Sequence, residues 1–135
     1  MTGFPKRLVY VDDEPQSRRI AKEAIGGDEG DPHHFVTCAT GRELIARIKE
    51  LQPDLILLDL RMPDMNGPDT IDELRKTPAY NHPPVIFITE RTKVVMIDEY
   101  KALGVIGVIH KPLDPMKLKS QIQNYWHEYK TLKAN

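Results

Sequence analysis

The sequence is poor in cysteine, has no excess of either charge and contains no long apolar run. The single cysteine, Cys38, excludes an intramolecular disulfide and a cysteine-built metal site, and it favours a reducing compartment. A formal net charge of −1 provides no basic field for nucleic acid or an anionic membrane. Runs such as Leu55–Leu58 are of strand length, and Met1–Pro5 lacks the features of a secretion signal. We therefore expect a cytoplasmic protein with neither nucleic acid nor a membrane as its main partner.

Strand-like and helix-like patterns alternate along the 135 residues, which is enough chain for a single domain. Apolar residues recur at helical spacing in Arg42–Leu51 and Lys117–Tyr129, and less regularly between Val94 and Leu103. Five short runs are rich in β-forming residues: Arg7–Val11, His34–Cys38, Leu55–Leu58, Val85–Ile88 and Val105–Ile109. This alternation predicts an α/β domain built on a parallel sheet.

Local chemistry marks three boundaries between these elements. The Asp13-Glu-Pro15 segment suits the start of a helix, because proline is favoured in the first helical turn. Asn66-Gly67 indicates a turn, and Gly104 follows a helical segment at a position that favours a left-handed cap.

Polar residues follow four of the five predicted strands. Because parallel strands end at one edge of a sheet, these side chains are expected to meet there. Two like charges about 4 Å apart repel by about 4 kcal/mol at an effective dielectric of 20, so crowded carboxylates require a cation or a proton. One lysine cannot balance three carboxylates, and oxygen ligands favour Mg²⁺. The residues concerned are Asp12, Asp13, Asp59, Thr89 and Lys111.

Four sequence features together resemble the receiver domain of two-component response regulators. They are VDDEP at 11–15, LLDLRMPDMNG at 57–67, Thr89 and HKP at 110–112. The similarity runs from about Lys6 to about Tyr129, so we expect one receiver domain over residues 1–135. The resemblance implies a flavodoxin-like (βα)5 three-layer sandwich with a parallel sheet of order 2-1-3-4-5.

The resemblance also implies a role for each matching residue. Asp59 would accept a phosphoryl group from a phosphohistidine of a sensor histidine kinase or a histidine phosphotransfer protein. Asp12, Asp13, Asp59 and the backbone carbonyl of Arg61 would hold Mg²⁺. Lys111 would pair with a phosphoryl oxygen, and Thr89 would donate its hydroxyl to another. Such a domain is no enzyme beyond its own phosphorylation and dephosphorylation.

Two positions depart from the family pattern. The family usually has an aromatic residue three positions before the lysine, where this chain has Val108, which puts the usual aromatic readout in doubt. The position after Thr89 is usually small, and here it is Glu90, a further carboxylate near the site. We hypothesise that Arg61 and Arg91 offset that charge and slow the attack of water on an acyl phosphate.

Three alternatives stay open at this point. Each motif alone has a structural explanation, since Asp-Asp-Glu-Pro suits a capped helix and Thr89 could cap the next one. A haloacid-dehalogenase-like phosphatase also uses an aspartate nucleophile, a threonine, a lysine and Mg²⁺, but it needs an acid where Arg61 stands. A pseudo-receiver would bind partners without phosphorylation. For a chain of this length we expect a stand-alone receiver that acts on an unknown downstream protein, and its final helix could form a homodimer face.

Overall fold

The protein forms a five-stranded parallel sheet with strand order β2-β1-β3-β4-β5. The computed structural model describes residues 3–26, 34–78, 81–90 and 97–134. The predicted strands are all present, and the last three extend one or two residues beyond the predicted ends. They are β1 (Arg7–Val11), β2 (His34–Cys38), β3 (Leu55–Asp59), β4 (Val85–Glu90) and β5 (Val105–Lys111). The predicted fold class and strand order are therefore confirmed.

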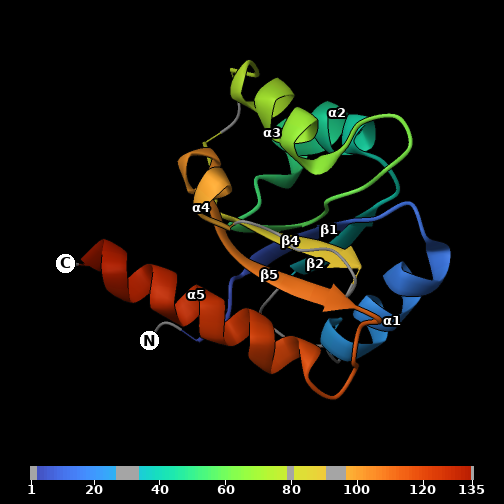
Figure 1. The fold of residues 1–135 in the computed structure, drawn as a ribbon, viewed down its shortest axis with the longest axis vertical. Coiled ribbons are helices and arrows are strands. Elements are labelled where there is room, and N and C mark those ends of the chain that lie inside the picture. The colour runs from blue at the N-terminus through green and yellow to red at the C-terminus, as the bar shows by residue number, and fades with distance from the viewer. Residues whose placement is uncertain (1–2, 27–33, 79–80, 91–96, 135) are drawn as a thin grey trace.

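Helices cover both faces of the sheet and make it the middle of three layers. Figure 1 shows α1 and α5 on one face, with α2, α3 and α4 on the other. The helices are α1 (Pro15–Ile25), α2 (Gly41–Leu51), α3 (Gly67–Arg75), α4 (Ile97–Tyr100), the 3-10 turn η1 (Lys101–Leu103) and α5 (Leu118–Ala134). The predicted helical segment from Val94 to Leu103 is described only from Ile97 onward, and Val94 and Val95 lie outside the described residues.

The apolar core is divided by the sheet into two clusters. The first lies between the sheet and helices α1 and α5, and it includes Leu57, Ile122 and Trp126. The second lies under α2, α3 and α4, and it includes Leu58 and Ile71. Because successive strand residues point to opposite faces, Leu57 and Leu58 enter different clusters. Burial on both faces explains why the central strands are almost continuously apolar.

The helix boundaries follow from local sequence, with one correction. Pro15 begins α1 as predicted, and Gly104 adopts a left-handed conformation with φ of 87° after η1. Asn66-Gly67 was predicted as a turn, but Asn66 is the N-cap of α3 and accepts a hydrogen bond from the Asp69 amide. The prediction was wrong because Asn-Gly favours turns and helix caps alike, and Pro68 in the first helical turn decides for the cap.

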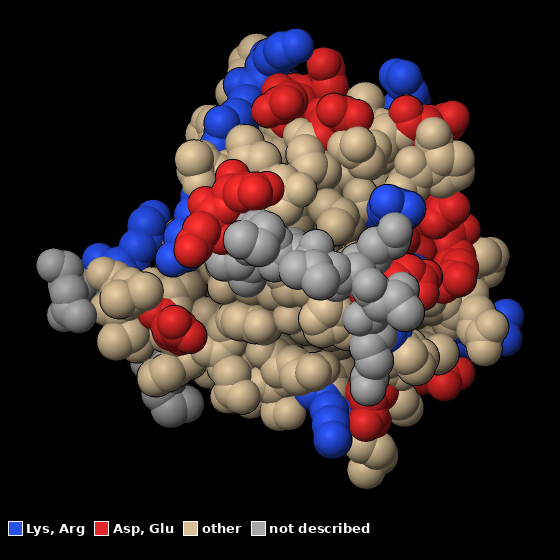
Figure 2. Space-filling model, in the orientation of Figure 1, with Lys and Arg blue, Asp and Glu red and all other residues tan. Residues whose placement is uncertain are grey.

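One face of the molecule carries charged side chains of both signs (Figure 2). On the face drawn in Figure 2, Lys and Arg lie among Asp and Glu, in agreement with the net charge of −1. Among the described helices, none combines the length and the apolar character that crossing a membrane would require.

Candidate metal centre and active site

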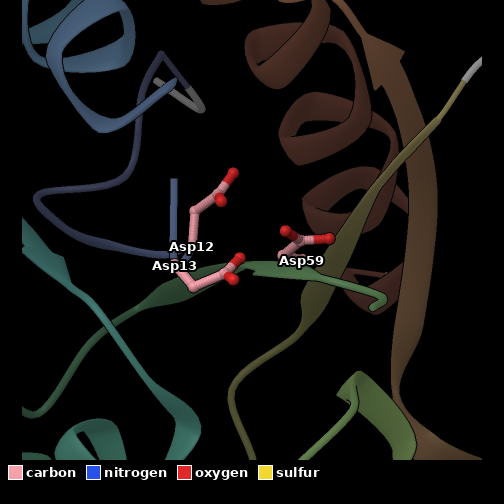
Figure 3. A group of neighbouring side chains, drawn as sticks. All are labelled: Asp12, Asp13 and Asp59. Carbon is pink, nitrogen blue, oxygen red and sulfur yellow. The ribbon is translucent and has the colours of Figure 1, made fainter. Parts of the chain in front are cut away.

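Three aspartates come together at the carboxyl edge of the sheet. Asp12 follows β1 directly and Asp59 ends β3, and the register pairs Val11 with Leu58, so these carboxylates leave neighbouring strands at the same level. Carboxylate oxygens of Asp12, Asp13 and Asp59 all lie within 4.8 Å of one another. Figure 3 shows the three side chains extending beyond the strand ends on neighbouring segments. The convergence predicted from the sequence is therefore present.

Lys111 reaches this cluster from the end of β5. Its Nζ lies 2.9 Å from Asp12 Oδ2 and 3.2 Å from Asp59 Oδ2. The Asp12 and Asp59 side chains are almost completely buried, at 0% and 6% exposed, and that of Lys111 is 10% exposed. The Lys111–Pro112 peptide bond is cis. A single ammonium group thus neutralises part of the charge of two buried carboxylates.

Burial disfavours the charged form of Asp59. Burial, followed by the charge of Asp12, raises the pKa of Asp59 from 3.8 to about 7, although Lys111 opposes this rise. Burial alone would lower the pKa of Lys111, but its hydrogen bonds to Asp12 and Asp59 and their charges hold it above its usual value. The lysine therefore stays protonated, whereas Asp59 carries its charge at neutral pH only with support from nearby cations.

The surroundings of Asp12 contain contacts that the sequence did not predict. Its Oδ2 accepts a hydrogen bond from the hydroxyl of Tyr10, and its Oδ1 accepts one from the Glu14 amide at 2.9 Å. Arg18 Nη1 donates to the Asp12 backbone carbonyl at 2.6 Å. The side chain and backbone of Asp12 are therefore held by strand β1 and by the start of α1.

Glu14 is a second addition to the predicted set. Its Oε1 lies 3.2 Å from Lys111 Nζ and 2.5 Å from Ser17 Oγ. The hydrogen bond from Ser17, followed by Lys111, lowers the pKa of Glu14. The position of Glu14 directly after an aspartate pair is a signal for this site in the sequence. Its contact with Lys111, however, depends on the direction in which α1 begins, which the sequence pattern does not give.

The segment after β3 folds back against Asp59. The Arg61 amide donates to Asp59 Oδ1 at 3.1 Å, and the Gly67 amide donates to the Leu60 carbonyl at 2.9 Å. A Cβ at position 67 would lie 2.8 Å from the Phe87 ring, so glycine permits this close approach. The structure thus places the Arg61 backbone beside Asp59, and the predicted use of its carbonyl as a metal ligand stays a prediction.

The remaining predicted positions lie on β4 and β5. Thr89 is 2% exposed and follows Ile88, the register partner of Asp59. Glu90 is exposed at the end of β4, whereas Val108 is half-buried and packs against the second apolar cluster. Arg91 lies outside the described residues.

The donor set fits a hard divalent cation. The cluster offers carboxylate oxygens, which Mg²⁺ and Ca²⁺ prefer over nitrogen or sulfur ligands. Asp13 is exposed, while Asp12 and Asp59 are buried, and among the described residues the cation that pairs with both of them is Lys111. Two buried carboxylates and a third at the surface therefore leave negative charge that a divalent ion would neutralise.

Fold and site together define a flavodoxin-like α/β domain with an acidic centre and a lysine at the carboxyl edge of its sheet. The family model of the response regulator receiver domain matches residues 8–123. This chain therefore belongs to the receiver domain family of two-component systems, as its motifs predicted.

Relatives and solved structures agree with this assignment. The DNA-binding response regulator MtrA of Mycolicibacterium smegmatis is 29% identical over 123 residues, which are 91% of this chain and 51% of MtrA. The histidine-protein kinase BarA of Escherichia coli K12 is 26% identical over 118 residues, 87% of this chain and 12% of BarA. The chain thus spans about half of MtrA and a small part of BarA.

Two solved structures show the same fold. Chemotaxis protein CheY4 of Vibrio cholerae has a TM-score of 0.74 at 29% identity, covering 87% of this chain and 96% of CheY4. The receiver domain of a LuxO-type repressor protein from Vibrio parahaemolyticus has a TM-score of 0.75 at 25% identity, covering 97% and 96% of the two chains.

Proposed function

We propose that this receiver domain takes a phosphoryl group onto Asp59 from the phosphohistidine of a sensor histidine kinase or histidine phosphotransfer protein. The observation that carries the proposal is the meeting of Asp12, Asp13, Asp59 and Lys111 at one sheet edge. The proposal includes a cytoplasmic location and relay of the signal by protein–protein contact.

In this reaction an Asp59 carboxylate oxygen forms a bond to phosphorus while the nitrogen–phosphorus bond of phosphohistidine breaks. The electron pair of the broken bond stays on the imidazole nitrogen of the donor. Asp59 Oδ1 is fixed by the Arg61 amide and its Oδ2 by Lys111, so the nucleophile is held in one orientation.

Asp12, Asp13, Asp59 and the Arg61 carbonyl would hold Mg²⁺, which when bound supplies positive charge for the transferring phosphoryl oxygens. Lys111 already lies 3.2 Å from Asp59 Oδ2 and can pair with a phosphoryl oxygen attached there. Thr89 at the end of β4 would donate its hydroxyl to another of these oxygens. The exposed side chain of Glu90 can turn to solvent, which limits its repulsion of the group.

Incubation with acetyl phosphate and Mg²⁺, followed by intact mass measurement, tests this function. We expect one added phosphoryl group on the wild-type chain and none on Asp59→Asn. Asp54→Asn is a matched control, because Asp54 lies just before the same strand and its carboxylate binds the Arg7 amide instead of Lys111.

Two results would contradict the proposal. Sustained hydrolysis of a phosphomonoester by the wild-type chain would favour the aspartate-nucleophile phosphatase. Failure of every phosphodonor to label Asp59, together with partner binding unaffected by Asp59→Asn, would favour the pseudo-receiver.

A further inference from the structure

Tyr10 places a phenol in the apolar layer between the sheet and helices α1 and α5. It is completely buried on strand β1, where its register partners are Thr37 of β2 and Leu57 of β3. Packing in this layer needs an apolar side chain but no hydroxyl. A buried hydroxyl without a hydrogen-bond partner costs about 1–3 kcal/mol of stability, so the Tyr10 hydroxyl needs a partner at this place.

The hydroxyl of Tyr10 donates to Asp12 Oδ2. The two residues lie two positions apart, so strand geometry directs both side chains to the same face of the sheet. Burial, followed by the charge of Asp12, raises the pKa of Tyr10, and the hydroxyl therefore keeps its proton and acts as a donor. The interaction is a hydrogen bond from a neutral phenol to a charged carboxylate, a strong class of hydrogen bond in proteins.

Three donors from different parts of the chain hold this one carboxylate. Lys111 Nζ shares Oδ2 with Tyr10, and the Glu14 amide binds Oδ1. Lys111 also contacts Asp59 and Glu14, so its ammonium group is shared among three carboxylates. Tyr10 belongs to a central strand and has no such competing contact among its described hydrogen bonds. The described hydrogen bond of Tyr10 is therefore made to Asp12, whereas the ammonium group of Lys111 is shared among three carboxylates.

We propose that Tyr10 is a positioning residue for the metal centre: its hydroxyl fixes the Asp12 carboxylate beside Asp13 and Asp59 and thereby raises their affinity for Mg²⁺. The inference rests on the metal requirement in the proposed function and assigns it a supporting residue in the core. Partners that orient a ligand in this way are typically worth about 10-fold to 100-fold in metal affinity.

Mg²⁺ titration by calorimetry tests the inference on wild type, Tyr10→Phe, Asp12→Asn and the double variant. We expect Tyr10→Phe to weaken Mg²⁺ binding about 10-fold, and to have no further effect in the Asp12→Asn background. Tyr125→Phe is the matched control, because it removes a hydroxyl that donates to the Val108 carbonyl at 3.0 Å and not to a carboxylate. Its Mg²⁺ affinity should stay at the wild-type value.

A spectroscopic readout separates positioning from packing. Mg²⁺ should change the near-ultraviolet tyrosine absorption of the wild-type chain and of Tyr125→Phe, but not that of Tyr10→Phe. An unchanged Mg²⁺ affinity in Tyr10→Phe would overturn the inference. So would a loss of Mg²⁺ affinity on adding Tyr10→Phe to Asp12→Asn that equals the loss in the wild-type background. Either result would leave the proposed function intact. If Tyr10→Phe does not fold, the wild-type spectrum decides, and the absence of a tyrosine change overturns the inference. A wild-type chain that binds no Mg²⁺ would overturn both.

Discussion

The stability of the metal-free protein should depend on pH through Asp59. Burial and Asp12 raise the pKa of Asp59 from 3.8 to about 7, so between these values the folded chain binds a proton that the unfolded chain releases. The stabilising contribution of the protonated carboxyl is complete below about pH 4 and is lost as the pH rises through about 7. Asp59 therefore makes the metal-free protein less stable at neutral pH than in mild acid.

The size of this effect follows from the pKa change. At 1.36 kcal/mol for each pH unit, a rise from 3.8 to about 7 corresponds to up to about 4 kcal/mol of unfolding free energy. Asp59→Asn keeps the shape of the protonated side chain and never ionises. In urea unfolding with EDTA, the variant should match wild type at about pH 4 and exceed it by up to about 4 kcal/mol at about pH 8.

The comparison between wild type and Asp59→Asn cancels the contributions of titrating groups that lie away from Asp59. Asp98→Asn controls for the loss of a carboxylate, because the Asp98 side chain is 87% exposed. Its unfolding free energy should stay within about 1 kcal/mol of the wild-type value, because the ion pair that it loses with Lys101 is exposed. Parallel curves for wild type and Asp59→Asn, or a gap that narrows as the pH rises, would refute the account of Asp59 given above.

Two further substitutions probe contacts that hold the site and its strand in place. Lys111→Met should lower the unfolding free energy by about 3–5 kcal/mol at about pH 8, because it removes the cation that pairs with buried Asp12 and Asp59. A loss of less than about 1 kcal/mol would contradict this reasoning. Gly107→Ala should cost about 1–3 kcal/mol in urea unfolding, because a Cβ there lies 2.5 Å from Tyr125 ring carbons. The same change in a Tyr125→Ala background should cost less, and an undiminished cost would show that the ring is not the cause.

The sheet was predictable because its strands carry their signal locally. Runs such as Leu55–Leu58 are apolar on both faces, and this pattern specifies a strand covered by helices on each side. The gathering of Asp12, Asp59 and Lys111 followed from one topological rule, that parallel strands end at a common edge. Cys38 and Trp126 are also buried, because small or aromatic side chains on an apolar face are favoured in cores.

The contacts that could not be predicted from the sequence join residues whose distance from one another is set by the folded structure. Tyr10 resembled any apolar residue of a buried strand, and only the position of Asp12 beyond the strand end gives its hydroxyl a partner. Glu14 looked like an acidic residue near a helix start, but its carboxylate turns toward Lys111, 97 positions away. Periodicity reports which face a residue occupies, not which atom a hydroxyl or carboxylate reaches on that face.

Strand β5 and helix α5 are connected through the backbone at position 108. Its side chain packs into the second apolar cluster, and its carbonyl accepts a hydrogen bond from the Tyr125 hydroxyl at 3.0 Å. The Tyr125 ring lies directly over Gly107, where any larger residue would displace it. The Tyr125 ring packs against the first apolar cluster and the Val108 side chain against the second, so the two side chains lie on opposite faces of the sheet. Lys111 lies three residues further along the same strand, so α5 stays joined to the strand that carries the lysine.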